Sequence, residues 1–178
     1  MEIICVCTGN KFDEWYVDNL KHMLRNQPHE KFHVIRKLEL GGVYDKLQMF
    51  RDFTQGQYLY FDLDVVIQGD VSEFVREDFT VLDAWWRPTF HTPLNSSVIS
   101  WAGNRSDIYD KFMENEDINF LKYNKGIDEF FWREIHPQTY DKAASSYDWT
   151  GWTDTNVVLF NQSHHTMREK GPWSKFTL

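Results

Sequence analysis

Residues 58–67 read YLYFDLDVVI and give the strongest strand signal in the sequence. Aromatic and β-branched residues dominate this run, as is typical of a buried strand. Two acids, Asp62 and Asp64, interrupt it, although VVI at 65–67 continues the apolar pattern. Side chains two residues apart share one strand face at about 7 Å, and a buried carboxylate is costly unless it is paired or bound to a metal. We therefore expect both acids to address a divalent cation; the alternative is a strand that ends there in a polar turn.

Three chemistries use an acid pair of this kind. A calcium-binding EF-hand loop is excluded, because Val66 and Ile67 stand where an oxygen ligand and a glycine are required. A phosphatase of the haloacid-dehalogenase type would use Asp62 as its nucleophile and Asp64 as its acid/base, but that family carries the motif on its first strand. The third chemistry is that of nucleotide-sugar transferases, in which an Asp-x-Asp pair addresses the Mg²⁺ or Mn²⁺ that carries a diphosphate.

The regions around this segment alternate between strand and helix patterns. Apolar runs bounded by turn residues predict further strands at 2–7, 32–35, 80–86, 97–101 and 157–160. Helical spacing predicts helices at 12–25, 45–53, 107–112 and 127–135, and the tail from 161 to 178 is expected to be irregular. We therefore expect one α/β domain.

Composition excludes several classes of protein. The chain has 178 residues, of which 27 are acidic and 19 basic, for a net charge of −8. It lacks the Lys and Arg excess that binds nucleic-acid backbones or anionic lipid, and no apolar run approaches the roughly 20 residues of a membrane span. The N-terminus lacks a signal-peptide pattern, and Cys5 and Cys7 are too close along one strand for an unstrained disulfide. We expect a cytoplasmic protein with free thiols and no nucleic-acid partner.

Aromatic residues make up 17% of the chain, including eight tryptophans. Trp149 and Trp152 lie in a polar, glycine-containing stretch, where exposed indoles could stack on an acceptor sugar or pack beneath the loop. Trp85 and Trp86 belong to an apolar run and are expected in the core. So many aromatics on a small domain also leave room for a homodimer interface.

Six motifs, in order along most of the chain, resemble glycosyltransferases of the GT-A fold, particularly the glycogenin and lipopolysaccharide galactosyltransferase-like family. They are IICVCTGN (3–10), GGVYDKLQMF (41–50), YLYFDLDVVIQGDVSEF (58–74), LNSSVISW (94–101), KGIDEFFW (125–132) and HTMREKGPW (165–173). The resemblance implies a single GT-A domain over residues 1–178, Rossmann-like, with a mixed, mostly parallel sheet flanked by helices. Residues 1–75 would bind nucleotide and metal. Residues 76–178 would bind the donor sugar and the acceptor and would end in a tail that binds metal and phosphate.

The same resemblance implies which side chains bind the donor. Thr8 and Asn10 follow the first strand, in the segment that holds the base and ribose in the family. Lys46 and Lys170 would approach the phosphates, and Asp62 would contribute to the same nucleotide site.

The resemblance further implies a metal site and a sugar site. Asp62, Asp64 and His165 would hold Mn²⁺ or Mg²⁺, with His164 and Asn161 as alternatives to His165. The register of strand 157–160 would by itself place this ligand at Leu159 or Asn161. Asn95 would contact the transferred sugar, and Asp128 would face the reacting centre.

The activity implied is metal-dependent transfer of a hexose from a nucleotide-diphosphate donor, expected to be UDP-linked, to a carbohydrate or protein acceptor. The family leans towards retention of the anomeric configuration. Two alternatives stay open: the phosphatase that uses Asp62 as nucleophile, and a catalytically weak module that binds nucleotides or carbohydrates.

Overall fold

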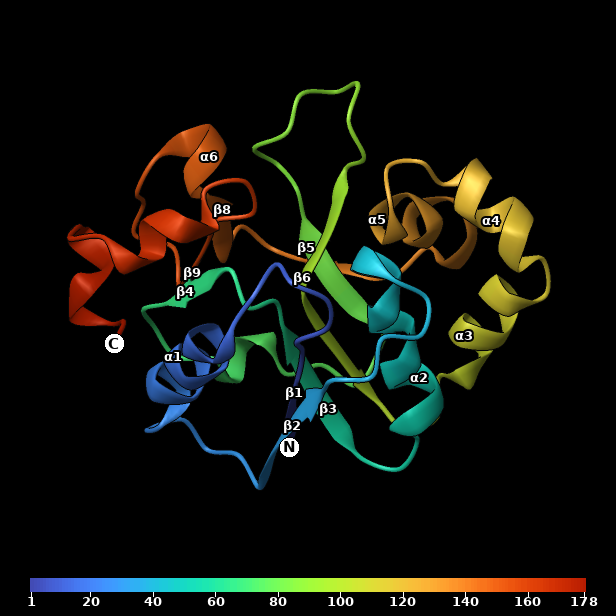
Figure 1. Cartoon of the computed structure of the whole chain (residues 1–178), viewed down its shortest axis with the longest axis horizontal. Helices are drawn as coiled ribbons and strands as arrows, with labels where there is room; N and C mark the ends of the chain where they lie inside the picture. The colour runs from blue at the N-terminus through green and yellow to red at the C-terminus, as the bar shows by residue number, and fades with distance from the viewer.

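A central sheet of six strands carries the fold (Figure 1). The computed structural model describes residues 1–178. The strand order is β2-β1-β3-β6-β5-β7; β1 runs parallel to β2 and β3, and β6 runs antiparallel to β3 and β5. A smaller sheet has the order β4-β9-β8. The strands are β1 (Glu2–Val6), β2 (Lys31–Ile35), β3 (Gln57–Phe61), β4 (Val65–Ile67), β5 (Thr80–Asp83), β6 (Leu94–Ala102), β7 (Gln138–Tyr140), β8 (Ala144–Ser146) and β9 (Val157–Leu159).

Helices cover both faces of the central sheet. The α-helices are α1 (Glu14–Leu24), α2 (Gln48–Asp52), α3 (Ser106–Met113), α4 (Glu116–Lys122), α5 (Ile127–Phe130) and α6 (Tyr147–Thr150). The 3₁₀ helices are η1 (Gly42–Leu47), η2 (Ser72–Phe74), η4 (His164–Arg168) and η5 (Pro172–Lys175), and η3 (Phe131–Ile135) is a π-helical turn. No helix combines the length and the apolar composition needed to cross a bilayer.

Strand alternation divides the core into two layers. Ile3 and Cys5 of β1 face a cluster that contains α1 and the small sheet, whereas Ile4 faces a cluster built with α2, α3 and α5. This is the period of two expected for a strand buried on both faces. The mixed α/β sheet flanked by helices confirms the expected fold class.

The expectation that residues 58–67 form one strand is wrong. β3 ends at Phe61, and β4 begins at Val65 in the other sheet, where it pairs with β9. The apolar run continues past the acids because a second buried strand follows, and the DLD segment is the turn between the two sheets. The strand end set aside as the alternative is therefore the correct description, and the acids do not share a strand face.

The C-terminal tail is more ordered than its polar sequence indicates. It forms η4 and η5, and Met167 and Trp173 are buried in the cluster around α1 and the small sheet. Strands β7 and β8 and helix α4 were also not predicted, because they are short and lack clear periodicity. Of the paired tryptophans, Trp86 is buried, whereas Trp85 lies beyond the end of β5 and is 37% exposed.

Candidate active site

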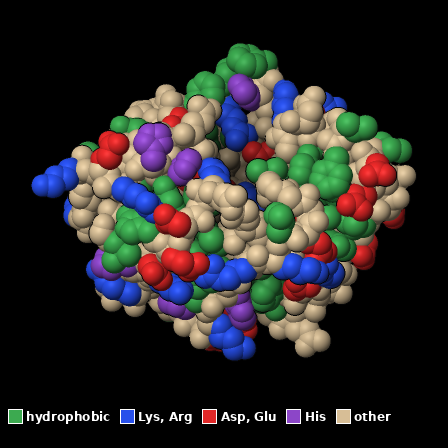
Figure 2. All heavy atoms as spheres, viewed as in Figure 1, with side chains coloured by type: hydrophobic (Ala, Val, Ile, Leu, Met, Phe, Trp, Pro, Cys, Tyr) green, Lys and Arg blue, Asp and Glu red, His purple; other side chains and the backbone are tan.

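A cavity of about 330 Å³ opens where the central sheet meets the small sheet. Its walls come from the turn after β1, helix η1, the turn between β3 and β4, the β5–β6 loop, the start of β6, the start of α5 and Asn161 beyond β9. Figure 2 shows a hollow in this face of the molecule with basic and acidic side chains at its edge. The carboxyl ends of β1 and β3 lie at this edge, which is where open α/β sheets bind ligands.

Asp62 lines the cavity and is bound by a lysine. The Lys46 ammonium lies 2.7 Å from the Asp62 carboxylate and also donates to the Ser96 carbonyl and hydroxyl oxygens at 3.2 Å. The Tyr60 hydroxyl donates to the same carboxylate from β3. Lys46 and Asp62 are only 10% and 16% exposed, so their attraction is weakly screened and both groups are held in fixed positions.

Asp64 is almost completely buried and faces a second lysine. The Lys11 ammonium lies 2.9 Å from one oxygen of Asp64, and the Asn161 side-chain amide donates to the other at 3.3 Å. Burial, and next the charge of Asp62, raise the pKa of Asp64 above its ordinary value, and Lys11 opposes this shift. The turn thus carries two carboxylates, each paired with an ammonium that lines the same cavity.

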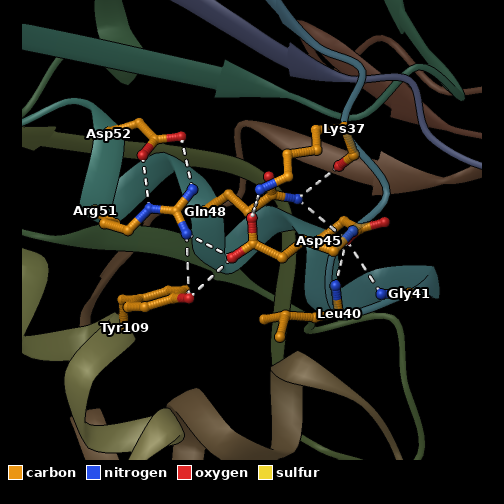
Figure 3. A network of polar contacts seen from close by, with 9 residues as sticks. Lys37, Leu40, Gly41, Asp45, Gln48, Arg51, Asp52 and Tyr109 are labelled. Carbon is orange, nitrogen blue, oxygen red and sulfur yellow. Dashed lines mark hydrogen bonds and ion pairs between the residues drawn. The ribbon is translucent and has the colours of Figure 1, made fainter.

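A network behind the cavity fixes the segment that leads to Lys46 (Figure 3). One oxygen of the buried Asp45 carboxylate accepts bonds from the backbone amides of residues 39, 40 and 41 at 2.9–3.1 Å. The other oxygen accepts from the Thr8 hydroxyl at 2.6 Å. Burial acts to raise the pKa of Asp45, but these hydrogen bonds outweigh it and lower the pKa. Because Asp45 precedes Lys46, the network sets the position of η1 against the turn after β1.

A third carboxylate closes the far wall of the cavity. Asp128, in the first turn of α5, accepts from both terminal nitrogens of Arg87 at 3.1 Å and from the Ser96 backbone amide at 2.9 Å. Asn95 lies next to this group on β6, where its side-chain oxygen accepts from the Ser97 amide at 2.9 Å. Both oxygens of Asp128 are therefore held in place.

The cavity gathers most of the side chains that the sequence pointed to. Six of the predicted site residues line it: Thr8, Lys46, Asp62, Asp64, Asn95 and Asp128. Three others do not line it: Asn10, His165 and Lys170, all of which are exposed.

The structure does not bring His165 to the acid pair, and the fold explains why. β9 ends at Leu159 beside β4, so Asn161 is the residue that leaves the sheet next to Asp64. Four residues later the chain is in η4, where His165 is exposed and His164 packs against the rings of Phe12 and Tyr16. Of the three ligands considered for this position, Asn161 alone lines the cavity.

Sequence reasoning missed Lys11, Arg87 and Lys125, which line the cavity. Lys11 follows directly on the TGN motif, and this adjacency to a predicted nucleotide-binding turn was a usable signal. Arg87 lies in the β5–β6 loop, and only the fold shows that this loop reaches Asp128. An isolated basic residue in a loop is normally a solvated surface charge, so no local pattern distinguishes it.

The donor set fits an oxygen-preferring cation in part. Asp62 and Asp64 offer carboxylate oxygens, and Asn161 adds an amide beside them. No group of three His, Cys, Asp or Glu side chains is arranged to hold a metal alone. Mg²⁺ and related ions are commonly held by one or two carboxylates together with substrate phosphates and water. The residues therefore suit an ion that arrives with a diphosphate, once Lys11 releases Asp64.

Comparison with solved structures places this architecture among glycosyltransferases. A glycosyltransferase involved in the glycosylation of the major capsid of PBCV-1 superposes with a TM-score of 0.69 at 9% identity, over 92% of this chain and 95% of that one. The galactosyltransferase LgtC, in complex with donor and acceptor sugar analogues, gives 0.63 at 10% identity over 89% and 86%. The glycosyltransferase GlyE of Streptococcus pneumoniae TIGR4 gives 0.60 at 10% identity, over 99% of this chain and 56% of that one.

The chain therefore has a GT-A-type glycosyltransferase fold, as the sequence resemblance implies. At 9–10% identity the likeness establishes the fold alone. The sequence matches no protein-family model and no curated protein.

Proposed function

We propose that this chain is a glycosyltransferase that takes a sugar from a nucleotide-diphosphate donor bound in the 330 Å³ cavity. The observation that carries the proposal is the convergence of Asp62 and Asp64 with Lys46 and Lys11 at the carboxyl edge of the sheet. Alternating carboxylates and ammoniums of this kind suit a diphosphate, with or without its cation. A UDP-linked hexose is the first donor to test, on the strength of the sequence resemblance.

Each group of side chains that lines the cavity would then have a role in the reaction. Transfer breaks the bond between the anomeric carbon and a phosphate oxygen, so negative charge grows on the departing diphosphate. Lys46 and Lys11 are positioned cations that would stabilise this charge as it develops. The sugar becomes oxocarbenium-like, and the fixed carboxylate of Asp128 would stabilise its positive charge, with Asn95 orienting the ring.

Asp62 and Asp64, with Asn161, are the side chains that would hold Mn²⁺ or Mg²⁺. When bound, the ion would act as a Lewis acid on the leaving diphosphate.

Asp62, Asp64 and Asp128 are the acidic residues that line the cavity. With the first two committed to the diphosphate end and both oxygens of Asp128 already hydrogen-bonded, none of these three carboxylates is free to act as base, and this favours a retaining reaction.

Product release tests this proposal. Incubation with UDP- and GDP-hexoses and Mn²⁺ is expected to release the nucleoside diphosphate from at least one donor, by slow hydrolysis or by transfer, as measured by NMR. Asp64→Asn is expected to lower that rate at least about tenfold, while Asp107→Asn, at an exposed position on α3, leaves it unchanged.

The other outcomes contradict the proposal in distinguishable ways. Release of inorganic phosphate from simple phosphate esters, with a trapped aspartyl phosphate at Asp62, would identify a phosphatase. Nucleotide binding without turnover of any donor in the panel would identify a binding module.

A further inference from the structure

A second cavity of about 140 Å³ adjoins the first. The two share four lining residues, namely Arg87, Lys125, Asp128 and Asn161. The remaining walls of the second cavity come from the β5–β6 loop and from the segment around α6, with Gln162 after β9. In Figure 1 this loop rises above the central sheet, between α6 and α5.

His91 and Trp149 line this second cavity, and Phe90 packs beside them without lining it. The His91 ring packs edge-on against Trp149 with centroids 5.6 Å apart, and Phe90 packs against His91 at 4.8 Å. Trp149 is 44% exposed and Phe90 is 73% exposed, so two large apolar surfaces remain in contact with water. An exposed aromatic surface at the mouth of a polar cavity is typical of a ligand-binding site.

The polar groups of the second cavity balance in charge. Arg87 and Lys125 are matched by Asp128 and Asp148. Asp148 accepts from the Gln162 backbone amide at 3.0 Å and from the Ser163 hydroxyl, and Lys125 donates to the Phe90 carbonyl, so the cavity offers an ionic ligand no net charge. The other polar lining groups are neutral hydroxyls and amides, which exchange hydrogen bonds with ligand hydroxyls.

The residues that line both cavities determine which groups a ligand in the second cavity would contact. Asp128 lies on both cavities, and Arg87 and the Ser96 amide hold its carboxylate. Asn161, which donates to the Asp64 carboxylate, also lines both cavities, so a group in the second cavity would lie next to both Asp128 and the acid pair. An acceptor hydroxyl group bound there would lie beside the departing diphosphate, which is the face it must attack in a retaining transfer without a covalent intermediate.

We propose that the second cavity binds the terminal sugar of a neutral carbohydrate acceptor, with the Trp149 indole as its stacking surface. This inference rests on the proposed function, because it assigns the second substrate of the same reaction. A sugar has an apolar face of C–H groups and a rim of hydroxyls, which match the indole and the neutral polar lining respectively.

The test measures binding of neutral sugars and of nucleotide in the same sample. The probes are methyl glycosides of glucose, galactose, mannose and N-acetylglucosamine, together with lactose, titrated to tens of millimolar by saturation-transfer NMR. At least one of them is expected to bind, and Trp149→Ala is expected to weaken that binding about tenfold. Trp149→Phe, which keeps an aromatic face, should recover part of the affinity. Trp132→Ala is the matched control, because Trp132 is 41% exposed and lines neither cavity.

The two proposals fail separately in this experiment. Nucleotide binding with no response from any neutral glycoside would overturn the acceptor proposal and leave the donor site intact. Glycoside binding that Trp149→Ala does not change would also overturn it, as would binding of acceptor peptides in place of sugars. Glycoside binding without binding of any nucleotide would instead contradict the proposed function.

Discussion

At the scale of single residues, the site depends on how a buried acid is neutralised. The Asp64 side chain is 3% exposed, and its nearest cation is Lys11, which is 48% exposed. Burial and the charge of Asp62 raise the pKa of Asp64. The ionised carboxylate is therefore less favourable in the folded chain than in the unfolded chain, and its cost disappears when the group is protonated.

Replacing Lys11 tests this account. Lys11→Met removes the cation that opposes the upward shift of the Asp64 pKa, so the free energy of unfolding at pH 7 should fall by about 1–2 kcal/mol. Because the folded-state pKa of Asp64 lies above the unfolded one, lowering the pH towards 5 protonates Asp64 preferentially in the folded form. The difference in free energy of unfolding between Lys11→Met and wild type should therefore become smaller. Urea denaturation at both pH values measures the effect.

Lys21→Met is the matched control, since Lys21 is 49% exposed and lies 3.8 Å from the exposed Asp18. A loss of stability in Lys11→Met that is identical at pH 7 and pH 5 would show that Asp64 is not the group responsible.

The sequence predicts site residues well where they stand in closely spaced motifs, and poorly where tertiary contacts bring them to the site. Asp62, Asp64 and Lys46 stand in tightly spaced motifs, and the structure brings all three to one cavity. The prediction for His165 rests on a motif match in the tail, where a shift of four residues changes which side chain faces the site. The structure has Asn161 at the cavity in place of His165. Lys11 and Arg87 reach the acids only through tertiary contacts, which no local pattern records.

At the scale of elements, the segment before η1 is held by hydrogen bonds to one carboxylate. Asp45 is fully buried and accepts from three backbone amides, the Thr8 hydroxyl and the Gln48 side chain. Nearby, Arg51 and Lys37 lower the pKa of Glu39 to about 2 by donating to its carboxylate. The carboxylates of Asp45 and Glu39 thus hold the segment before Lys46 against the rest of the domain.

Substituting Asp45 should therefore weaken both stability and the site. Asp45→Asn keeps one acceptor oxygen but removes the charge and places an amide against a donor, so a loss of about 1–3 kcal/mol in the free energy of unfolding is expected. Nucleotide affinity should also fall, because Lys46 follows directly. Denaturant titration and calorimetry measure the two effects, with Asp107→Asn as control, since Asp107 is 63% exposed and lies outside this network. A stability equal to that of the control would contradict the role assigned to Asp45.

The element that the sequence described least well is also the one that carries the acids. Apolar periodicity cannot distinguish one long strand from two strands separated by a two- or three-residue crossing, because both keep the run buried. Here β3 and β4 belong to different sheets, and the partner of β4 is β9, almost a hundred residues later. Sequence-distant pairing of this kind decided where the acids point.

At the scale of the whole molecule, the two sheets produce the cavity. The central sheet supplies the turn after β1 and the start of β6, and the small sheet brings Asn161 to the opposite side. The fold class was predictable because the alternation of strands and helices extends over most of the chain. The second cavity was not, since it depends on how the β5–β6 loop meets α6.

Calorimetric titration with UDP and GDP, with and without Mn²⁺, tests the central claim most directly. The account predicts that one nucleotide binds in a 1:1 complex and that Asp64→Asn weakens its affinity about tenfold or more. Asp107→Asn should have no effect, because Asp107 is an exposed residue of α3 outside the cavity. Failure of both nucleotides to bind, or binding that Asp64→Asn leaves unchanged, would show that the acid pair does not face a nucleotide diphosphate.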